Sequence, residues 1–64
     1  MNPIDPSTLV GRTVAEARRL VESRGYEFRV LIEDGRSSFA TTDFRLDRVN
    51  VEAAAGKVVR ADIG

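Results

Sequence analysis

The side chains that could take part in chemistry in this chain are mostly arginines and carboxylates. The 64 residues include ten acidic and ten basic side chains, but no cysteine and no histidine. A thiol nucleophile, a Cys/His zinc site and a catalytic triad with an imidazole base are therefore excluded. No other nucleophile–base pair can be assembled, so we expect a binding protein that uses no cofactor rather than an enzyme.

The densest charged segment lies in residues 43–48, where Asp43, Arg45, Asp47 and Arg48 bring two carboxylates and two guanidinium groups together. Nine of the ten basic residues of the chain are arginine. Arginine binds carboxylates and carbonyl oxygens through a planar fork of donors that lysine lacks. From the residues alone, ordinary ion pairs along a solvated strand are the simpler interpretation of this segment.

Metal, nucleic-acid and membrane binding are not favoured by the composition. Glu33, Asp34, Asp43 and Asp47 could gather around a hard cation such as calcium, but their spacing matches no known calcium loop, so we expect no metal site. A net charge of zero and a pI near 6.2 provide no electrostatic footprint for nucleic acid or an anionic membrane surface. No apolar stretch approaches the ~20 residues that span a bilayer.

The first residues lack the basic and apolar regions of a secretory signal. The chain is therefore expected to be either a cytoplasmic protein or the mature form of a secreted one. Its small size favours a monomer, although an exposed edge strand and Phe39 leave a dimer open.

The elements that must position the charged segment begin with a helix. Thr13 and Glu16 fit a capping box, in which each side chain binds the backbone N–H of the other residue. The apolar stripe that follows consists of Val14, Ala17, Leu20 and Val21. Gly25 ends a helix of about three turns. Residues 1–8, which carry both prolines, are expected to form an irregular arm before a single domain at 9–64.

Alternating apolar residues predict extended segments after this helix, at 26–32, 44–51 and 58–63, with a tight connection at 53–57. The order of elements predicts an α+β fold in which one helix covers one face of a small sheet.

The link from Ile32 to Phe44 has two interpretations. Asp34-Gly35 is a good signal for a hairpin that pairs residues 30–32 with residues 39–41. Alternatively, residues 33–43 form one long exposed loop between two parallel strands, and loops of that length in compact domains are usually functional or disordered. The local pattern does not decide between the two, nor whether Phe39 packs into the core or contacts a partner.

Three segments carry a resemblance to known proteins. The first reads Leu9-Val10-Gly11-Arg12-Thr13-Val14-x-x-Ala17, the second Thr42-Asp43-Phe44-Arg45-Leu46-Asp47-Arg48-Val49, and the last Val58-Val59-Arg60-Ala61-Asp62-Ile63-Gly64. Together they resemble the potato type I inhibitor family, which includes the eglins and barley chymotrypsin inhibitors. Asn50-Val51-Glu52 is more similar to a related bacterial branch of small peptidase inhibitors.

The resemblance implies a helix packed on a small mixed sheet of three to four strands, with a long exposed binding loop between two parallel strands. It also implies inhibition of a serine endopeptidase of the subtilisin, elastase or chymotrypsin type, with the loop bound as a substrate (the standard mechanism). A non-inhibitory protein–protein interaction module on the same fold is the alternative.

The resemblance further assigns residues to roles. The reactive bond would be Thr42–Asp43, and the loop that binds the protease would comprise Phe39, Ala40, Thr41, Thr42, Asp43 and Phe44. The loop would be braced by Arg45, Arg48, Asn50 and Gly64. Charge-assisted bonds from arginine to Asp43 and Thr41 would contribute roughly 1.5–3 kcal/mol each.

The chain departs from the family in three respects. The segment between Gly35 and Thr42 is longer than in the family, and Asn50 stands where plant and leech members carry a further arginine. Thr42 is smaller than the Met or Leu that is typical at the pocket position. A small, β-branched side chain there implies a shallow protease pocket and modest affinity.

Overall fold

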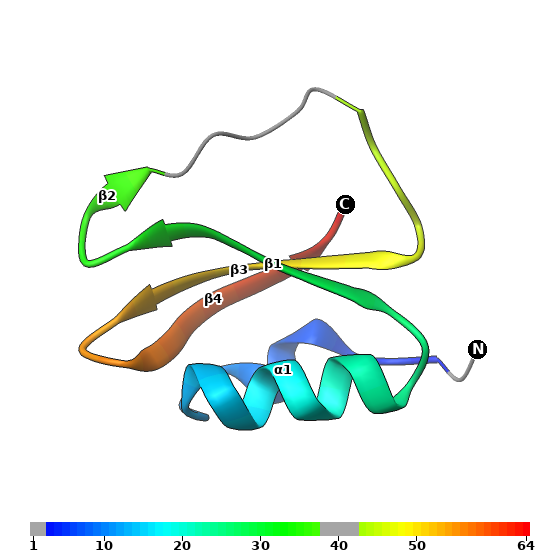
Figure 1. Ribbon diagram of the computed structural model, residues 1–64, viewed down its shortest axis with the longest axis horizontal. Coiled ribbons are helices and arrows are strands. Elements are labelled where there is room, and N and C mark those ends of the chain that lie inside the picture. Colours follow the sequence, from blue (N-terminus) through cyan, green and yellow to red (C-terminus); the bar gives the residue numbers. More distant parts are fainter. Residues whose placement is uncertain (1–2, 38–42) are drawn as a thin grey trace.

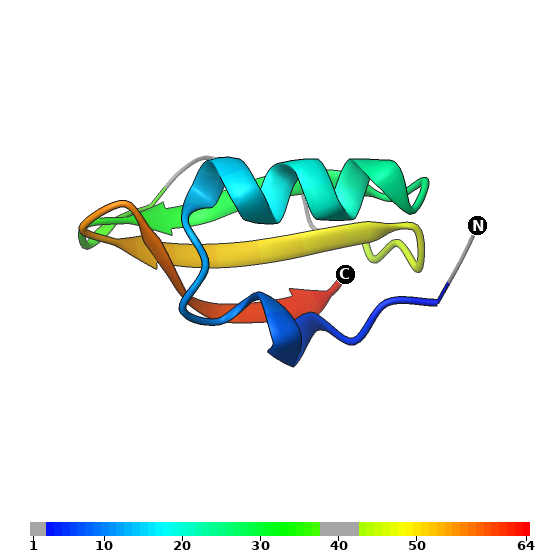
Figure 2. The same ribbon diagram turned by 90° about the horizontal axis from the view of Figure 1, so that it is seen from below.

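The computed structural model describes residues 3–37 and 43–64. Helix α1 (Val14–Ser23) lies across one face of a sheet formed by strands β1 (Glu27–Glu33), β2 (Arg36–Ser37), β3 (Arg48–Ala54) and β4 (Lys57–Ile63), and a 3-10 helix η1 (Pro6–Leu9) lies beside β4 (Figures 1 and 2). The strand order is β2-β1-β3-β4. The predicted α+β fold, one helix on a small mixed sheet, is confirmed.

The two central strands of the sheet are parallel. β1 pairs with β3 in a register that sets Glu27 opposite Arg48 and Arg29 opposite Asn50, while β2 and β4 add to the edges in antiparallel orientation. Parallel strands need a long crossover between them. Here the crossover is residues 34–47, which contains β2, and its residues 43–47 lie on the side of the sheet opposite α1 (Figure 1).

The predicted boundaries of the helix are confirmed. The Thr13 hydroxyl accepts a hydrogen bond from Glu16 N at 3.1 Å, and Glu16 Oε1 accepts one from Thr13 N at 3.1 Å, which completes the capping box. Gly25 follows the last turn with a φ of +84°, a conformation that glycine adopts without strain.

The core lies between α1, η1 and the strands β1, β3 and β4. Its buried side chains are Leu9, Ala17, Val21, Phe28, Val49, Val51 and Val58. The first of them comes from η1, so the predicted irregular arm is wrong for residues 6–8. Asp5 caps this short helix by accepting a hydrogen bond from Ser7 N at 3.0 Å, and the turn carries Leu9 into the core.

Both interpretations of the link after Ile32 are partly right. Asp34 and Gly35 have φ values of +50° and +79°, as the central residues of a type I′ hairpin turn require, and Ile32 pairs with Ser37. The hairpin therefore coexists with the parallel pairing of β1 and β3. The predicted pairing of residues 30–32 with 39–41 is wrong for Ile32, whose partner is Ser37, while 39–41 themselves lie outside the described residues.

The predicted limits of β3 differ most from the structure, while those of β1 and β4 differ by at most one residue. The extended run expected from Phe44 becomes a strand only at Arg48, because residues 46–47 form a turn in which Arg45 binds Asp47. At the other end β3 continues to Ala54. The connection to β4 is therefore a turn at 55–56, shorter than the predicted connection at 53–57. Asp34 Oδ1 accepts a hydrogen bond from Ala55 N at 2.8 Å, which joins the two turns at this end of the sheet.

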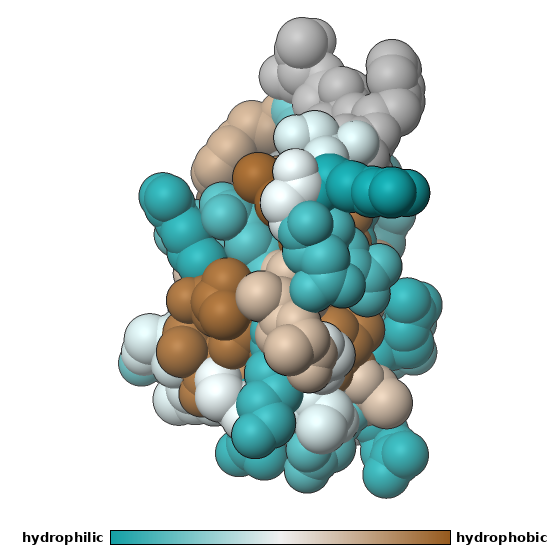
Figure 3. Space-filling view, turned by 90° about the vertical axis from the view of Figure 1, so that its left-hand side faces the viewer, coloured by the Kyte–Doolittle hydropathy of each residue, from teal (hydrophilic) through white to brown (hydrophobic). Residues whose placement is uncertain are grey.

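The exterior is polar with scattered apolar residues. Viewed from the end with the two turns, apolar areas are separated by hydrophilic side chains (Figure 3). Among residues 3–37 and 43–64, the large apolar side chains that remain exposed are those of Val10, Phe44, Leu46 and Val59. Within 3–37 and 43–64, no helix has the length and apolar character needed to cross a bilayer.

Candidate functional site

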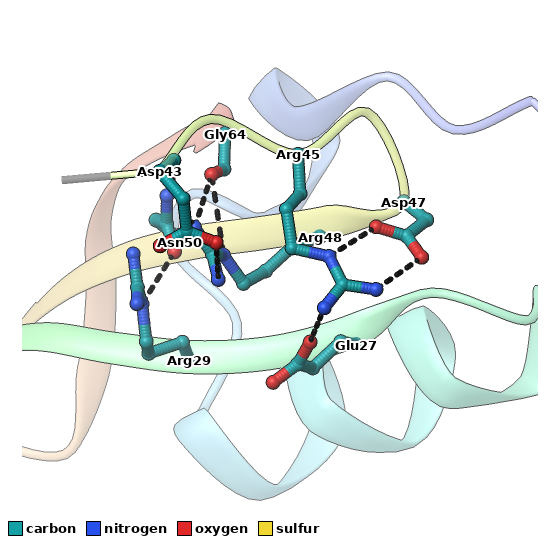
Figure 4. A network of polar contacts seen from close by, with 8 residues as sticks. All are labelled: Glu27, Arg29, Asp43, Arg45, Asp47, Arg48, Asn50 and Gly64. Carbon is teal, nitrogen blue, oxygen red and sulfur yellow. Dashed lines mark hydrogen bonds and ion pairs between the residues drawn. The ribbon is translucent and has the colours of Figure 1, made fainter. Parts of the chain in front are cut away.

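The Arg48 side chain lies at the start of β3, on the sheet face turned away from α1, and is only 4% exposed. Its Nη2 donates to the backbone oxygen of Asp43 at 2.8 Å. The Gly64 backbone oxygen accepts from Nε at 3.2 Å and from Nη2 at 2.6 Å. One guanidinium therefore joins the chain that enters β3 to the residue that follows β4 (Figure 4). We refer to Asp43, Arg48 and Gly64 as the clamp.

Burial of a guanidinium is costly unless its donors are bonded. Arg48 is the one buried charged residue in the described part of the chain, and no buried side-chain nitrogen or oxygen there lacks a hydrogen-bond partner. The Asp43 carboxylate, which is about half exposed, lies 3.6 Å from Arg48 Nη1 and adds a charge contact to the backbone bonds. The clamp thus combines backbone hydrogen bonds with an ion pair to a residue of the predicted reactive bond.

Gly64 completes the clamp at a position where a side chain would fit only tightly. A Cβ built on this residue would lie 3.1 Å from Asn50 Nδ2 and 3.7 Å from the Phe44 ring. The Gly64 N–H donates to Arg48 O at 2.9 Å, and the Gly64 oxygen also accepts from Arg45 N at 3.1 Å. The end of β4 is therefore bonded on both sides to the segment that carries Arg45 and Arg48.

Among the described residues, the Arg45 side chain binds Asp47, and most of the loop that it is expected to brace lies outside them. Its guanidinium forms two bonds with the Asp47 carboxylate, at 2.9 and 2.8 Å, and lies 3.9 Å from Glu27 Oε2. These bonds raise the pKa of Arg45 and lower the pKa of Asp47. Arg45 is linked to the clamp by its backbone N–H, which donates to Gly64 O, and by a weaker charge attraction to Asp43 that also raises its pKa. Its guanidinium itself forms an exposed ion pair with Asp47.

Asn50 lies one pleat along β3 from Arg48, on the same face. Its Oδ1 accepts a hydrogen bond from Arg29 Nε at 3.0 Å, across the parallel pair in which the two residues stand opposite each other. Arg29 was not among the residues predicted for the site. The signal that could have found it is its polar position in the alternating run 26–32, on the same face as Leu31 and opposite that of Phe28.

Of the predicted protease-binding loop, only Asp43 and Phe44 are described. Phe39, Ala40, Thr41 and Thr42 lie outside the described residues, as does the expected bond from arginine to Thr41. The Phe44 side chain is 69% exposed and one edge of its ring faces the Gly64 backbone. Phe44 therefore lies next to the clamp and remains largely accessible to a partner.

Other kinds of site find less support in the described residues. Within 3–37 and 43–64, no group of three or more His, Cys, Asp or Glu side chains is arranged to hold a metal ion. An open hollow lined by Glu16, Arg19, Leu20 and Ser23 lies on α1, on the other side of the sheet from the clamp. It contains no paired acid and base and no buried polar group, so the clamp is the stronger candidate.

Comparison with known proteins identifies no relative: no family model, no curated protein and no solved structure matches the chain. Function is therefore inferred from the geometry of the clamp and from the resemblance of the three sequence segments.

Proposed function

We propose that this protein inhibits a serine endopeptidase by binding it as a substrate, with Thr42–Asp43 as the reactive bond. The observation that carries the proposal is the buried Arg48 guanidinium. It binds the backbone oxygen of Asp43, the residue on the leaving side of that bond, and ties it to Gly64. The proposal also rests on the resemblance of the chain to potato type I inhibitors. Asn50-Val51-Glu52 is more similar to their bacterial branch.

Rigidity on the leaving side is what separates an inhibitor from a substrate. When the protease serine attacks the Thr42 carbonyl carbon, the C–N bond to Asp43 breaks and the nitrogen takes a proton, which gives an acyl-enzyme and a new amino group on Asp43. An ordinary leaving peptide diffuses away. Here the clamp holds Asp43 in place, so the amine can attack the acyl carbon, release the serine and restore the bond.

Preorganisation also favours the initial complex. A flexible substrate loop loses conformational freedom when a protease binds it, which costs about 0.5–1.5 kcal/mol for each side chain that is ordered. Bonds from Arg48 and Gly64 already order residues 43–45 in the free protein. The exposed ring of Phe44 adds apolar surface on the leaving side, next to the proposed reactive bond.

The partner that fits this proposal is a subtilisin-, elastase- or chymotrypsin-like protease with a shallow pocket for Thr42. The inhibitor would act as a monomer, without a cofactor, and would be neither an enzyme nor a nucleic-acid-binding protein. A non-inhibitory interaction module on the same fold would use the same face of the molecule, and the following experiment separates the two.

The test titrates subtilisin, elastase, chymotrypsin and trypsin with the protein, and mass spectrometry follows the chain in each mixture. We expect saturating inhibition of at least one protease, with slow cleavage confined to Thr42–Asp43. Thr42→Pro and Asp43→Ala should abolish or weaken inhibition, while Arg60→Ala, an exposed ion-pair residue on β4, serves as the matched control. Rapid cleavage without inhibition would contradict the proposal. A protein that is neither cut nor inhibitory would favour the interaction module.

A further inference from the structure

A second arginine lies close to the clamp but does not belong to it. Arg29 extends from β1 toward Asn50, on the sheet face where Arg48 and Asp43 also lie (Figure 4). Its Nε donates to Asn50 Oδ1 at 3.0 Å, a partly buried bond between residues 21 positions apart in the chain. Three polar side chains on the two central strands, those of Arg29, Arg48 and Asn50, thus lie on the same face as residues 43–45 (Figure 4).

Asn50 connects this arginine to Gly64. One end of the Asn50 amide accepts from Arg29, and the other, Nδ2, lies 3.1 Å from where a Gly64 Cβ would be. The amide therefore lies beside Gly64, whose backbone oxygen accepts hydrogen bonds from Arg48 and from the N–H of Arg45. A continuous row of contacts runs from β1 through β3 to the end of β4 and back to the segment at 43–45.

We propose that Arg29 is a further positioning residue, which holds the Asn50 amide against Gly64 and thereby fixes the segment on the leaving side of the proposed reactive bond. This inference rests on the proposed function. In this scheme Arg29 acts through the hydrogen bond to Asn50 and does not contact the protease. The planar Nε–H of arginine fixes the orientation of the amide, which a lysine ammonium could not do in the same geometry.

A nearby arginine provides the internal comparison. Arg60 lies on β4, where its side chain is 68% exposed and pairs with the carboxylates of Asp62 and Glu52, at 3.2 and 4.0 Å. Exposed pairs of that kind contribute little to stability. Arg29 instead binds a neutral amide that is itself packed against a buried backbone. A comparison of variants of the two arginines therefore distinguishes a positioning role from the general effect of removing a positive charge from the sheet.

The first test measures amide hydrogen exchange in Arg29→Ala, Arg29→Lys, Asn50→Ala and the control Arg60→Ala. We expect Arg29→Ala to speed exchange of the Arg45 and Gly64 amides about tenfold. This is the effect expected from the loss of one charge-assisted hydrogen bond. The Val58 amide, which donates to Arg12 O at 2.8 Å, reports overall stability and should not change.

The pattern among the variants is part of the expected result. Asn50→Ala should match Arg29→Ala, the double variant should add nothing further, and Arg29→Lys should fail to restore slow exchange. Equal exchange in Arg29→Ala and Arg60→Ala would overturn the inference. So would an equal acceleration at Val58, because that would indicate a loss of global stability.

The second test measures the inhibition constant and the rate of cleavage at Thr42–Asp43 for the same variants. We expect Arg29→Ala to weaken inhibition and to speed cleavage by about tenfold, with Arg60→Ala like the wild type. If the wild type inhibits but Arg29→Ala leaves both quantities unchanged, the inference is wrong while the proposed function stands. If the wild type inhibits no protease, the proposed function fails, and the exchange data alone decide whether Arg29 orders the segment.

Discussion

The two faces of β3 have opposite character. Val49, Val51 and Ala53 are at most 2% exposed and belong to the side that packs under α1. Arg48 and Asn50 alternate with them and point toward residues 43–45. The first face is stabilised by the removal of apolar surface from water, the second by directional bonds to backbone and amide groups.

One strand can therefore stabilise the fold through its apolar face and order a neighbouring segment through its polar face. Apolar burial is non-directional, so it fixes where the strand lies but not the conformation of a segment beside it. Hydrogen bonds to a carbonyl oxygen do fix such a segment, because they weaken steeply when the geometry changes. Substitutions on the two faces should therefore have different consequences.

The largest effect on stability is expected on the apolar face. Val51→Ala should lower the free energy of unfolding by about 2–3 kcal/mol, because it removes two buried methyl groups and leaves a cavity. Urea denaturation measures the change. Inhibition measured well below the unfolding transition should remain close to that of the wild type, since the clamp is untouched. A proportionate loss of inhibition in the fully folded variant would contradict the separation of the two faces.

On the polar face, Arg48→Ala should cost about 1–3 kcal/mol of stability, because it removes the hydrogen bonds that the guanidinium donates to the backbone oxygens of Asp43 and Gly64. Its effect on inhibition should be greater than that of Val51→Ala, and cleavage at Thr42–Asp43 should become fast. Arg45→Ala is the matched control, since that guanidinium binds Asp47 outside the clamp. The comparison would fail if both arginine variants inhibited equally well.

The smallest effect concerns pH. Hydrogen bonding to Arg45 lowers the pKa of Asp47, and the bonds with Thr13 lower the pKa of Glu16 on the helix side. Each carboxylate therefore contributes stability that is present above its unfolded pKa and is lost as the pH falls through its lower folded pKa. Both groups are exposed, so the losses should be small.

Urea midpoints measured between about pH 5 and about pH 2 should show this decline. Asp47→Asn and Glu16→Gln should each remove part of the slope. If Asp47→Asn also speeds cleavage at Thr42–Asp43, the Arg45–Asp47 pair contributes to loop order. The clamp would then have to include these two residues.

Much of the fold follows from local spacing. The capping box at Thr13 and Glu16 and the turn at Asp34 and Gly35 involve residues that are close in the chain, so their hydrogen bonds can be inferred from the order of residue types. The helix stripe predicts burial of Ala17 for the same reason. Such features need no knowledge of the rest of the molecule.

The features that were missed depend on distant residues. The bond between Arg29 and Asn50 requires the register of two parallel strands, which alternation alone does not specify. The burial of Leu9 depends on the way η1 packs beside β4. The start of the third strand was misplaced because alternation at 44–47 resembles a strand, whereas the pairing of Arg45 with Asp47 folds that stretch into a turn.

The turn between β3 and β4 has a practical consequence. The chain contains a single lysine, Lys57, which is exposed at the start of β4. β4 runs from this turn to Gly64, so the ammonium lies at the end of the sheet away from the clamp (Figure 1). Coupling of this amine to a sensor chip or a dye would anchor the protein with Asp43 and Phe44 facing the solution, without any engineered attachment site.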